Sequence, residues 1–226
     1  MIFEQLFDQK SSTYTYIIAS GEGREALIID PVIEHSDEYS TILKNLDLKL
    51  VKVIDTHIHA DHISALNELN KRTNCIRVMG EKSKSEVIDL RIKDGEKIKV
   101  EEVELQAIYT PGHTDCSYSF LMNDRVFTGD TLLINGSGRT DFQNGNAYDA
   151  YDSIFNKLLK LPEKTLVFPA HDYNGKKFST IENEKNNNPR LQVSSKEEYA
   201  DIMNNLNLAN PKMMDVAVPA LSLIHI

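Results

Sequence analysis

Four side chains of the kind that coordinate metals fall within six residues, directly after an apolar run typical of a buried strand. The run spans residues 50–55, and the stretch after it reads Thr-His-Ile-His-Ala-Asp-His. Alternate side chains share one face of an extended chain, so His57 and His59 can point the same way. Asp61 and His62 are expected at the start of the following helix. This spacing requires a fold in which a strand ends at a polar pocket.

Three later strand ends carry side chains of the same kinds. A Pro-Gly turn presents His113 after one predicted strand. A second strand ends at Asp130 and a third at His171. Taken alone, His113 is more often a turn residue bonded to the backbone, and Asp130 more often caps the element that follows. Together with the first segment, these imidazole and carboxylate groups match the ligands of zinc and Fe(II), with no thiolate among them.

The order of predicted elements indicates the fold class. Strands are expected at residues 13–19, 24–30, 50–55, 76–79, 97–100, 103–110, 117–122, 125–128 and 165–169. Helices are expected at residues 37–46, 63–72, 147–161, 180–187 and 195–206. A glycine-rich turn joins the first two strands into a hairpin. Strands in runs, with helices between and after them, favour sheet-on-sheet packing with outer helices over a regular alternation of strand and helix.

Length and charge limit the classes of function. A chain of 226 residues fits one domain, expected over residues 1–226 with a short C-terminal helical extension after about residue 190. The formal net charge of −9 argues against nucleic acid as a partner, because nucleic-acid binders usually carry a basic face. An anionic substrate would therefore need local positive charge to hold it.

Neither a membrane span nor an export signal is expected. The apolar runs are far too short to cross a bilayer. The N-terminus has no basic region followed by an apolar stretch and a cleavage site. The chain has two cysteines, Cys75 and Cys116, and reduced thiols in the cytoplasm are the simpler interpretation, with one disulfide as the alternative.

The combined motif, H-x-H-x-D-H followed by G-H, G-D and a late A-H, resembles the signature of the metallo-β-lactamase fold. The resemblance covers nearly the whole chain. It implies an α/β fold, an αββα sandwich of two mixed β-sheets flanked by helices, with the metal site at one edge of the sheets. This fold hosts hydrolases, oxidoreductases and nucleases, so it does not name a reaction by itself.

Within that fold, the chain is similar to the persulfide dioxygenases, a family related to glyoxalase II. The similar stretches are residues 56–63, 127–134, 138–143, 169–173, 188–191 and 215–220. Glyoxalase II typically has an aromatic residue where this chain has Ala60, and another aromatic-rich stretch where it has Thr140-Asp141. Only 55 residues follow His171, which leaves little room for the larger helical glutathione-binding region of that hydrolase.

The resemblance implies an Fe(II)-dependent dioxygenase with one iron per chain, held by His57, His113 and Asp130. Two imidazoles and one carboxylate form the facial triad of non-haem Fe(II) oxygenases and leave three positions open. Glutathione persulfide and O2 are the implied substrates, and sulfite and glutathione the products. The role belongs to the detoxification of sulfide and persulfide, and a homodimer is also implied.

The remaining residues of the motif have two possible roles. His59, Asp61, His62 and His171 would surround the iron ligands, orient them and hold water. Alternatively, they bind a second metal, as in the hydrolase.

The resemblance also assigns catalytic roles to Arg139, Tyr173 and His171, with Arg139 and Tyr173 contacting the substrate. The alternative for Arg139 is an ion pair with Asp141, and for Tyr173 a core aromatic with a satisfied hydroxyl. The tail, residues 221–226, departs from the family pattern.

Two other functions remain open from the sequence. One is a binuclear glutathione thioester hydrolase of the glyoxalase II type. The other is a non-catalytic module that binds a metal or a thiol. Which thiol carries the persulfide in the cell is also open.

Overall fold

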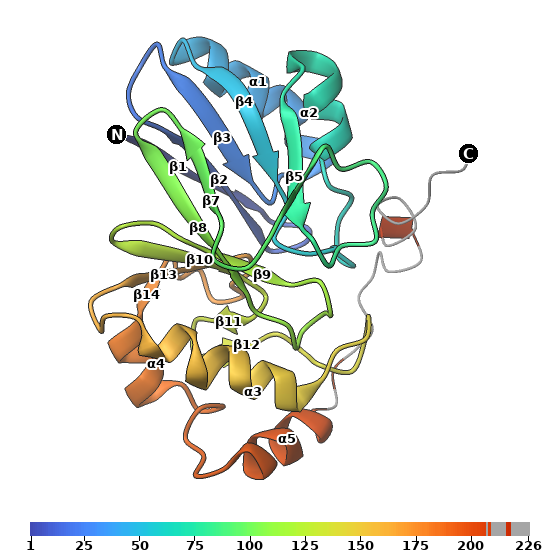
Figure 1. Ribbon diagram of the computed structural model, residues 1–226, viewed down its shortest axis with the longest axis vertical. Coiled ribbons are helices and arrows are strands. Elements are labelled where there is room, and N and C mark those ends of the chain that lie inside the picture. The colour runs from blue at the N-terminus through green and yellow to red at the C-terminus, as the bar shows by residue number, and fades with distance from the viewer. Residues whose placement is uncertain (207, 209–215, 218–226) are drawn as a thin grey trace.

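Two six-stranded sheets form the centre of the molecule, and the apolar runs of the sequence form their central strands. The structure is a computed structural model that describes residues 1–206, 208, 216 and 217 (Figure 1). The first sheet has the order β1-β2-β3-β4-β5-β6, with strands Ile2–Asp8, Thr13–Ala19, Glu25–Ile29, Lys49–Ile54, Ile76–Gly80 and Leu90–Ile92. The second has the order β14-β13-β10-β9-β8-β7, with strands Ser179–Thr180, Leu166–Pro169, Arg125–Gly129, Tyr118–Leu121, Val103–Tyr109 and Lys97–Val100.

Helices cover the outer face of each sheet (Figure 1). Helices α1 (Ser36–Asn45) and α2 (Leu66–Thr73) lie on the first sheet. Helices α3 (Ala147–Asn156), α4 (Ile181–Asn187) and α5 (Lys196–Asn204) lie on the second. The short strands β11 (Leu132–Leu133) and β12 (Gly136–Ser137) and the 3-10 turns η1 (Ile33–His35) and η2 (Leu158–Lys160) complete the described elements. The expected αββα sandwich is confirmed.

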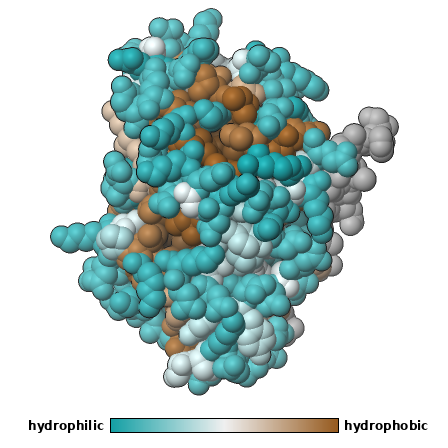
Figure 2. Space-filling model, viewed as in Figure 1, coloured by the Kyte–Doolittle hydropathy of each residue, from teal (hydrophilic) through white to brown (hydrophobic). Residues whose placement is uncertain are grey.

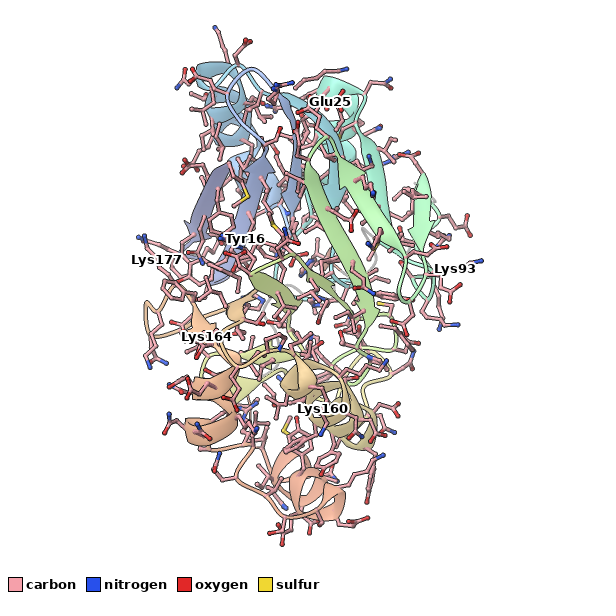
Figure 3. All side chains as sticks on the ribbon, turned by 60° about the vertical axis from the view of Figure 1, so that its left-hand side comes forward. Tyr16, Glu25, Lys93, Lys160, Lys164 and Lys177 are labelled. Atoms are coloured by element: carbon pink, nitrogen blue, oxygen red, sulfur yellow. The ribbon has the colours of Figure 1, made fainter. Side chains whose placement is uncertain are left out.

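The main core lies between the two sheets and is rich in aromatic side chains. Tyr16 of β2 is 1% exposed, and its ring lies 4.9 Å from that of Phe127 in β10. The Tyr16 hydroxyl donates to the carbonyl of Pro169, which ties the sheets together beside the strand end that carries His171. In Figure 3, Tyr16 lies inside the molecule while Lys93 and Lys177 project from its sides. This packing fixes the strand ends relative to one another.

The surface is mostly hydrophilic on the face shown in Figure 2, with apolar side chains gathered in patches. In the part of the chain that the structure describes, no helix is long and apolar enough to cross a membrane.

The element boundaries differ from expectation at one place that matters for the site. Helix α2 begins at Leu66, so Asp61 and His62 lie in the preceding loop and not at the start of the helix. Tertiary contacts hold this loop away from helical geometry, because Ser64 forms a bridge with Val32 and the Ala65 amide donates to the Pro31 carbonyl. The expected helix over residues 147–161 is also divided, with α3 ending at Asn156 and η2 following.

Of the C-terminal helical extension expected after residue 190, the structure describes α5, which packs on α3, and beyond it residues 205, 206, 208, 216 and 217. The tail at residues 221–226 lies outside the described residues, as does most of the similar stretch at residues 215–220.

Candidate metal centre

Four strands end at one edge of the sandwich, and each is followed by a metal-coordinating side chain. His57 follows β4, His113 follows β8, Asp130 follows β10 directly, and His171 follows β13. Because β4 belongs to the first sheet and the other three to the second, both sheets contribute to the site.

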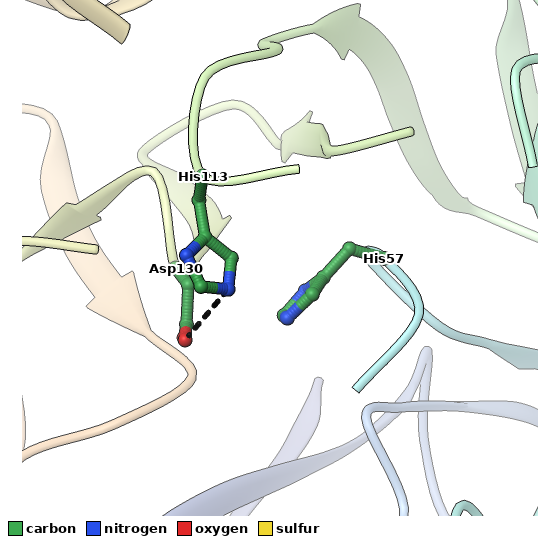
Figure 4. A group of neighbouring side chains, drawn as sticks. All are labelled: His57, His113 and Asp130. Carbon is green, nitrogen blue, oxygen red and sulfur yellow. Dashed lines mark ion pairs between the residues drawn. The ribbon is translucent and has the colours of Figure 1, made fainter. Parts of the chain in front are cut away.

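The first group consists of His57, His113 and Asp130. One possible ligand atom from each lies within 4.8 Å of the others, and Figure 4 shows the three side chains turned toward a common centre. The His113 Nε2 atom is 3.5 Å from the Asp130 Oδ2 atom. The rings of His57 and His113 have their centroids 4.9 Å apart. Two imidazoles and one carboxylate therefore converge as the sequence predicts.

Hydrogen bonds on the far side of each ring fix which nitrogen faces the centre. The His113 Nδ1 atom lies 2.7 Å from the Arg139 carbonyl, which can only accept, so Nδ1 carries the proton. The His57 Nδ1 atom lies 2.9 Å from the Thr56 hydroxyl, which donates to Asp30 and therefore accepts from the ring. Both Nε2 atoms are left with a lone pair directed at the centre, the arrangement of a metal-binding histidine.

Two buried atoms at the centre test whether the group suits a metal ion. Among the described residues, His57 Nε2 and Asp130 Oδ1 have no hydrogen-bond partner. A buried polar group without a partner costs about 1–3 kcal/mol. A cation at the centre would satisfy both atoms, so the donor set fits a metal.

A second group lies beside the first. One ligand atom each from His59, Asp61 and His62 lie within 4.8 Å of one another. The His171 Nε2 atom is 3.5 Å from Asp61 Oδ2 and 3.5 Å from Asp130 Oδ1, so it joins the two groups. Among the described residues, His59 Nδ1 and His62 Nε2 are buried without a hydrogen-bond partner. The structure thus brings all seven residues of the motif together, and the second group also has the composition of a cation site.

The acidic side chains make this pocket attractive to positive charge. Burial opposes a proton on His171, but Asp130 and Asp61 outweigh it and raise the pKa of that imidazole to about 10. Burial likewise opposes a proton on His59, yet Asp30, Asp55 and Asp61 raise its pKa to about 9. The carboxylates that stabilise a proton on these imidazoles would also stabilise a metal cation bound in the same place.

Asp30 supports the site and was missed by the sequence analysis. Its carboxylate accepts from the Thr56 amide (2.7 Å), from the Thr56 hydroxyl (3.0 Å) and from His59 Nε2 (3.2 Å). Asp30 adopts a positive φ of 49°, which is uncommon for a residue with a side chain. The one sequence signal is its position directly after a buried strand. Asp55 was also missed. Its Oδ1 atom lies 4.0 Å from His59 Nε2, and burial raises the pKa of the Asp55 carboxyl to about 7.

The metal-binding groups open into a pocket of about 390 Å³. Apolar side chains form part of its wall, namely Ala60, Leu133, Phe142 and Leu208. The charged and hydroxyl-bearing lining consists of Asp61, His113, Asp130, Arg139, His171, Tyr173 and Arg190, with Ser137.

The two predicted substrate contacts both line this pocket. Arg139 forms the ion pair that was its alternative role, with two contacts of 2.7 Å to Asp141, and its guanidinium lies 4.3 Å from the Phe142 ring centroid. The Arg139 side chain is thus held at the pocket wall by both Asp141 and Phe142, and it is more than a surface residue in an ion pair. Tyr173 is 72% exposed and stacks on His171, so its alternative role as a core aromatic is wrong.

Arg190 is a further lining residue to which the sequence analysis gave no role. It donates to the backbone carbonyl and the hydroxyl of Ser137. No carboxylate among the described residues forms an ion pair with it. Burial lowers the pKa of its guanidinium. A half-buried cation at a pocket wall without an acidic partner suits an anionic ligand.

Comparison with known proteins agrees with this geometry. The family model described as "Metallo-beta-lactamase superfamily" matches residues 9–89 and 80–171. The chain therefore belongs to the metallo-beta-lactamase superfamily.

More similar relatives indicate which family of the superfamily the chain belongs to. The chain is 43% identical over 223 residues to "Persulfide dioxygenase ETHE1, mitochondrial" of Mus musculus, covering 97% of this chain and 87% of the relative. It is 49% identical to the crystal structure of ETHE1 from Myxococcus xanthus, with a TM-score of 0.95 and 97% of each chain covered. Within the superfamily, the chain belongs to the persulfide dioxygenase family of enzymes.

The hydrolase branch is more distant. The "Hydroxyacylglutathione hydrolase" of Dictyostelium discoideum is 30% identical over 185 residues, covering 77% of this chain and 68% of the relative.

Proposed function

We propose that this protein oxidises glutathione persulfide with O2 and water, using one Fe(II) per chain. The overall reaction consumes one persulfide, one O2 and one water and releases glutathione and sulfurous acid, which ionises to sulfite. The outer sulfur is oxidised, O2 is reduced, and the sulfur–sulfur bond breaks. The proposed role is the detoxification of sulfide and persulfide.

The observation that carries this proposal is the convergence of His57, His113 and Asp130 in a chain that is 43% identical to a persulfide dioxygenase. We assign these three residues as the iron ligands. Fe(II) held by these residues would supply redox chemistry and room for an anionic sulfur ligand and for dioxygen. Asp130 would neutralise only part of the charge of such an ion, so the site would still attract an anion.

The pocket supports glutathione persulfide as the substrate. Its volume of about 390 Å³ lies within the range of small-molecule sites. Glutathione carries two carboxylates, and Arg139 and Arg190 offer guanidinium groups that suit carboxylates. Leu133 and Phe142 add apolar side chains to the pocket wall, where they would exclude water from a bound substrate. The exposed Tyr173 can donate its hydroxyl hydrogen bond to the substrate.

His171 is assigned to orient Asp130 and to hold a proton beside the reacting sulfur. Its Nδ1 atom donates to the Ser12 carbonyl at 3.0 Å, and its Nε2 atom faces Asp130 and Asp61. His59, Asp61 and His62 complete this outer layer and hold water and the ligands in place.

A binuclear thioester hydrolase is the second candidate, favoured by one observation. His59, Asp61 and His62 also place ligand atoms within 4.8 Å of one another, with His171 next to them. A second metal there would be held by these residues and would supply activated water for hydrolysis. The more distant relation to the hydrolase branch weighs against it.

Oxygen consumption tests the proposal. Protein purified without oxygen and supplied with glutathione persulfide is expected to consume one O2 for each sulfite formed. Hydrolysis of a glutathione thioester without O2 uptake would instead establish the hydrolase. Thiol binding that disappears when the metal is removed, with no product from the metal-loaded protein, would establish a non-catalytic module.

We also propose a cytoplasmic location and a homodimer. Cys75 and Cys116 are both buried and unpaired with each other, which fits a reducing compartment. The name of the mouse relative places that protein in mitochondria. Fractionation of the source cells tests the location, and light scattering tests the dimer.

A further inference from the structure

The turn between β1 and β2 reaches the metal centre from the far N-terminal end of the chain. Asp8 begins this turn by accepting from the backbone amide (2.7 Å) and the hydroxyl (2.6 Å) of Ser11. The turn ends at Thr13, which forms an isolated β-bridge with His171. The next amide, that of Tyr14, donates to the Ala170 carbonyl at 2.7 Å. The end of the turn is therefore fastened to the segment Ala170-His171.

The Thr13 side chain contacts Asp61, an acidic residue of the pocket lining. Thr13 is fully buried, and its hydroxyl donates to Asp61 Oδ2 at 3.1 Å. The Thr13 hydroxyl oxygen also lies 3.4 Å from His62 Nδ1 and 2.7 Å from the Ser11 hydroxyl. His62 Nδ1 itself lies 2.8 Å from Asp61 Oδ2. One carboxylate oxygen of Asp61 is thus held by two neighbours at once.

The backbone of Ser12 holds the other side. Its carbonyl accepts from His171 Nδ1 at 3.0 Å, which fixes the tautomer of that ring and turns Nε2 toward Asp130. Ser12 has a φ of 60°, a conformation that costs free energy in a residue with a side chain. The strained residue is the one whose carbonyl meets the imidazole.

We propose that this turn is a positioning element of the metal centre, acting through the Thr13 hydroxyl on Asp61 and through the Ser12 carbonyl on His171. It sets the orientation of the outer acid and imidazole groups, and through His171 that of Asp130. The inference rests on the proposed metal centre but not on the identity of the metal or of the substrate.

The buried threonine two residues further along β2 has a different role. The Thr15 hydroxyl donates to the Asp30 carbonyl at 2.8 Å, at the end of the neighbouring strand β3, and contacts the Tyr39 hydroxyl of α1 at 3.0 Å. The side-chain contacts of Thr13, by contrast, connect the turn to the metal pocket. Replacing the Thr13 hydroxyl therefore affects the pocket directly.

Metal affinity measured on the apo-protein tests the role of Thr13. Thr13→Val keeps the shape and removes the hydroxyl, so Co²⁺ affinity measured by chelator competition is expected to fall about tenfold, as for other groups that orient ligands. The absorption spectrum of bound Co²⁺ is expected to change as well. Thr13→Ser restores the hydroxyl and is expected to recover most of both. Thr165→Val, which changes a buried threonine directly before β13 of the other sheet, is the matched control.

A pair of substitutions tests the Ser12 carbonyl independently of any side-chain hydrogen bond. Ser12→Gly keeps the carbonyl and accepts a positive φ, so it is expected to retain the affinity and the Nδ1-protonated tautomer of His171. Ser12→Val cannot adopt this φ without strain, so it is expected to displace the carbonyl, weaken Co²⁺ binding and change the ¹⁵N shifts of the His171 ring.

The proposal is overturned if Thr13→Val binds Co²⁺ with the affinity and spectrum of Thr165→Val, or if Ser12→Val behaves like Ser12→Gly. If Thr13→Val fails to fold, the Ser12 pair decides. Failure of the proposed function has a separate signature, since it concerns O2 uptake by the unaltered protein and leaves these affinities unchanged.

Discussion

At the scale of single residues, the metal centre depends on which atom each side chain turns inward. The Arg139 carbonyl and the Thr56 hydroxyl each bind the Nδ1 atom of a histidine and leave Nε2 for the metal. The residue type alone does not determine this orientation, because it requires a partner on the far side of the ring.

Loss of one proposed ligand should empty the site without unfolding the protein. His113→Ala removes an imidazole at the pocket wall, where its side chain is 11% exposed, so the fold is expected to survive. Iron content is expected to fall to a small fraction of one per chain, together with O2 uptake. Gln106→Ala, which changes an exposed residue of β8 outside the pocket, is the control. Full iron content in His113→Ala would contradict the ligand assignment.

The two pocket arginines should affect substrate binding and leave iron binding intact. A charge-assisted hydrogen bond contributes about 1.5–3 kcal/mol, so Arg190→Gln is expected to raise KM for glutathione persulfide roughly 10- to 100-fold. Arg139→Ala is expected to keep its iron and bind substrate poorly as well. A persulfide without carboxylates should be insensitive to both changes. Unchanged kinetics in either variant would remove that arginine from the substrate site.

The sequence predicted the seven inward-facing residues because each follows an apolar strand and has a side chain suited to metals. It could not predict Asp30, Thr13 or Arg190 as parts of the site. Asp30 and Thr13 lie on β-strand ends far from the motif along the chain, and only the packing of the sheets brings them to it. Arg190 lies in a stretch similar to the family, but its missing acidic partner is a property of the folded chain.

At the scale of elements, the loop that follows β12 limits the room around two proposed ligands. A Cβ atom on Gly138 would lie 2.0 Å from the Asp130 carbonyl oxygen and 3.0 Å from His113 Cγ. Neither neighbour can move without shifting a proposed metal ligand. Glycine at this position is therefore a requirement of the site and not of a turn.

Gly138→Ala is accordingly expected to weaken metal binding by about tenfold or more and to lower the free energy of unfolding by about 1–3 kcal/mol, the usual cost of overpacking. Gly136→Ala is the matched control, because its added Cβ would meet only Leu133, at 3.9 Å. Chelator competition and denaturant unfolding of the apo-proteins measure the two effects. Equal metal affinities for the two variants would show that this loop does not constrain the ligands.

The junction between the β1–β2 turn and α1 should make stability depend on pH. The His35 ring forms hydrogen bonds with Asp8 at 3.0 Å and with Glu38 at 2.8 Å. These bonds raise the pKa of His35, with the larger effect from Asp8, although burial alone would lower it. A raised pKa in the folded state stabilises the protein below the unfolded pKa of about 6.5, and this contribution disappears as the pH rises through the folded value.

His35→Gln is therefore expected to lower the free energy of unfolding of the apo-protein by about 0.5–1 kcal/mol at pH 5.5 and by much less at pH 9. Urea unfolding at the two pH values measures the difference. A cost that is the same at both values would show that the charge on His35 does not contribute.

Helices and strands were predicted well where the pattern of apolar residues was long. They were predicted poorly where tertiary contacts determine the local structure. The strands of the two sheet centres and the helices were predicted close to their observed bounds. β1, β6 and β14 were not predicted, because they are edge strands that are short or partly exposed and carry weak alternation. The loop before α2 was assigned to the helix because its bonds to Val32 and Pro31 are tertiary.

At the scale of the whole molecule, a metal at this site would link the two sheets. His57 comes from the first sheet, and His113 and Asp130 come from the second. The sandwich architecture followed from the order of strands and helices together with the family resemblance. The number of metal ions did not, since the same seven residues can be divided into one site or two.

The proposed function depends on a single iron held by His57, His113 and Asp130, with His59, Asp61, His62 and His171 around it. Metal analysis of protein purified without oxygen tests this arrangement most directly. About one iron per chain is predicted, with no second ion taken up on titration to excess. Two metal ions per chain, both lost when Asp130 is replaced by Asn, would contradict the claim and establish a bridged pair.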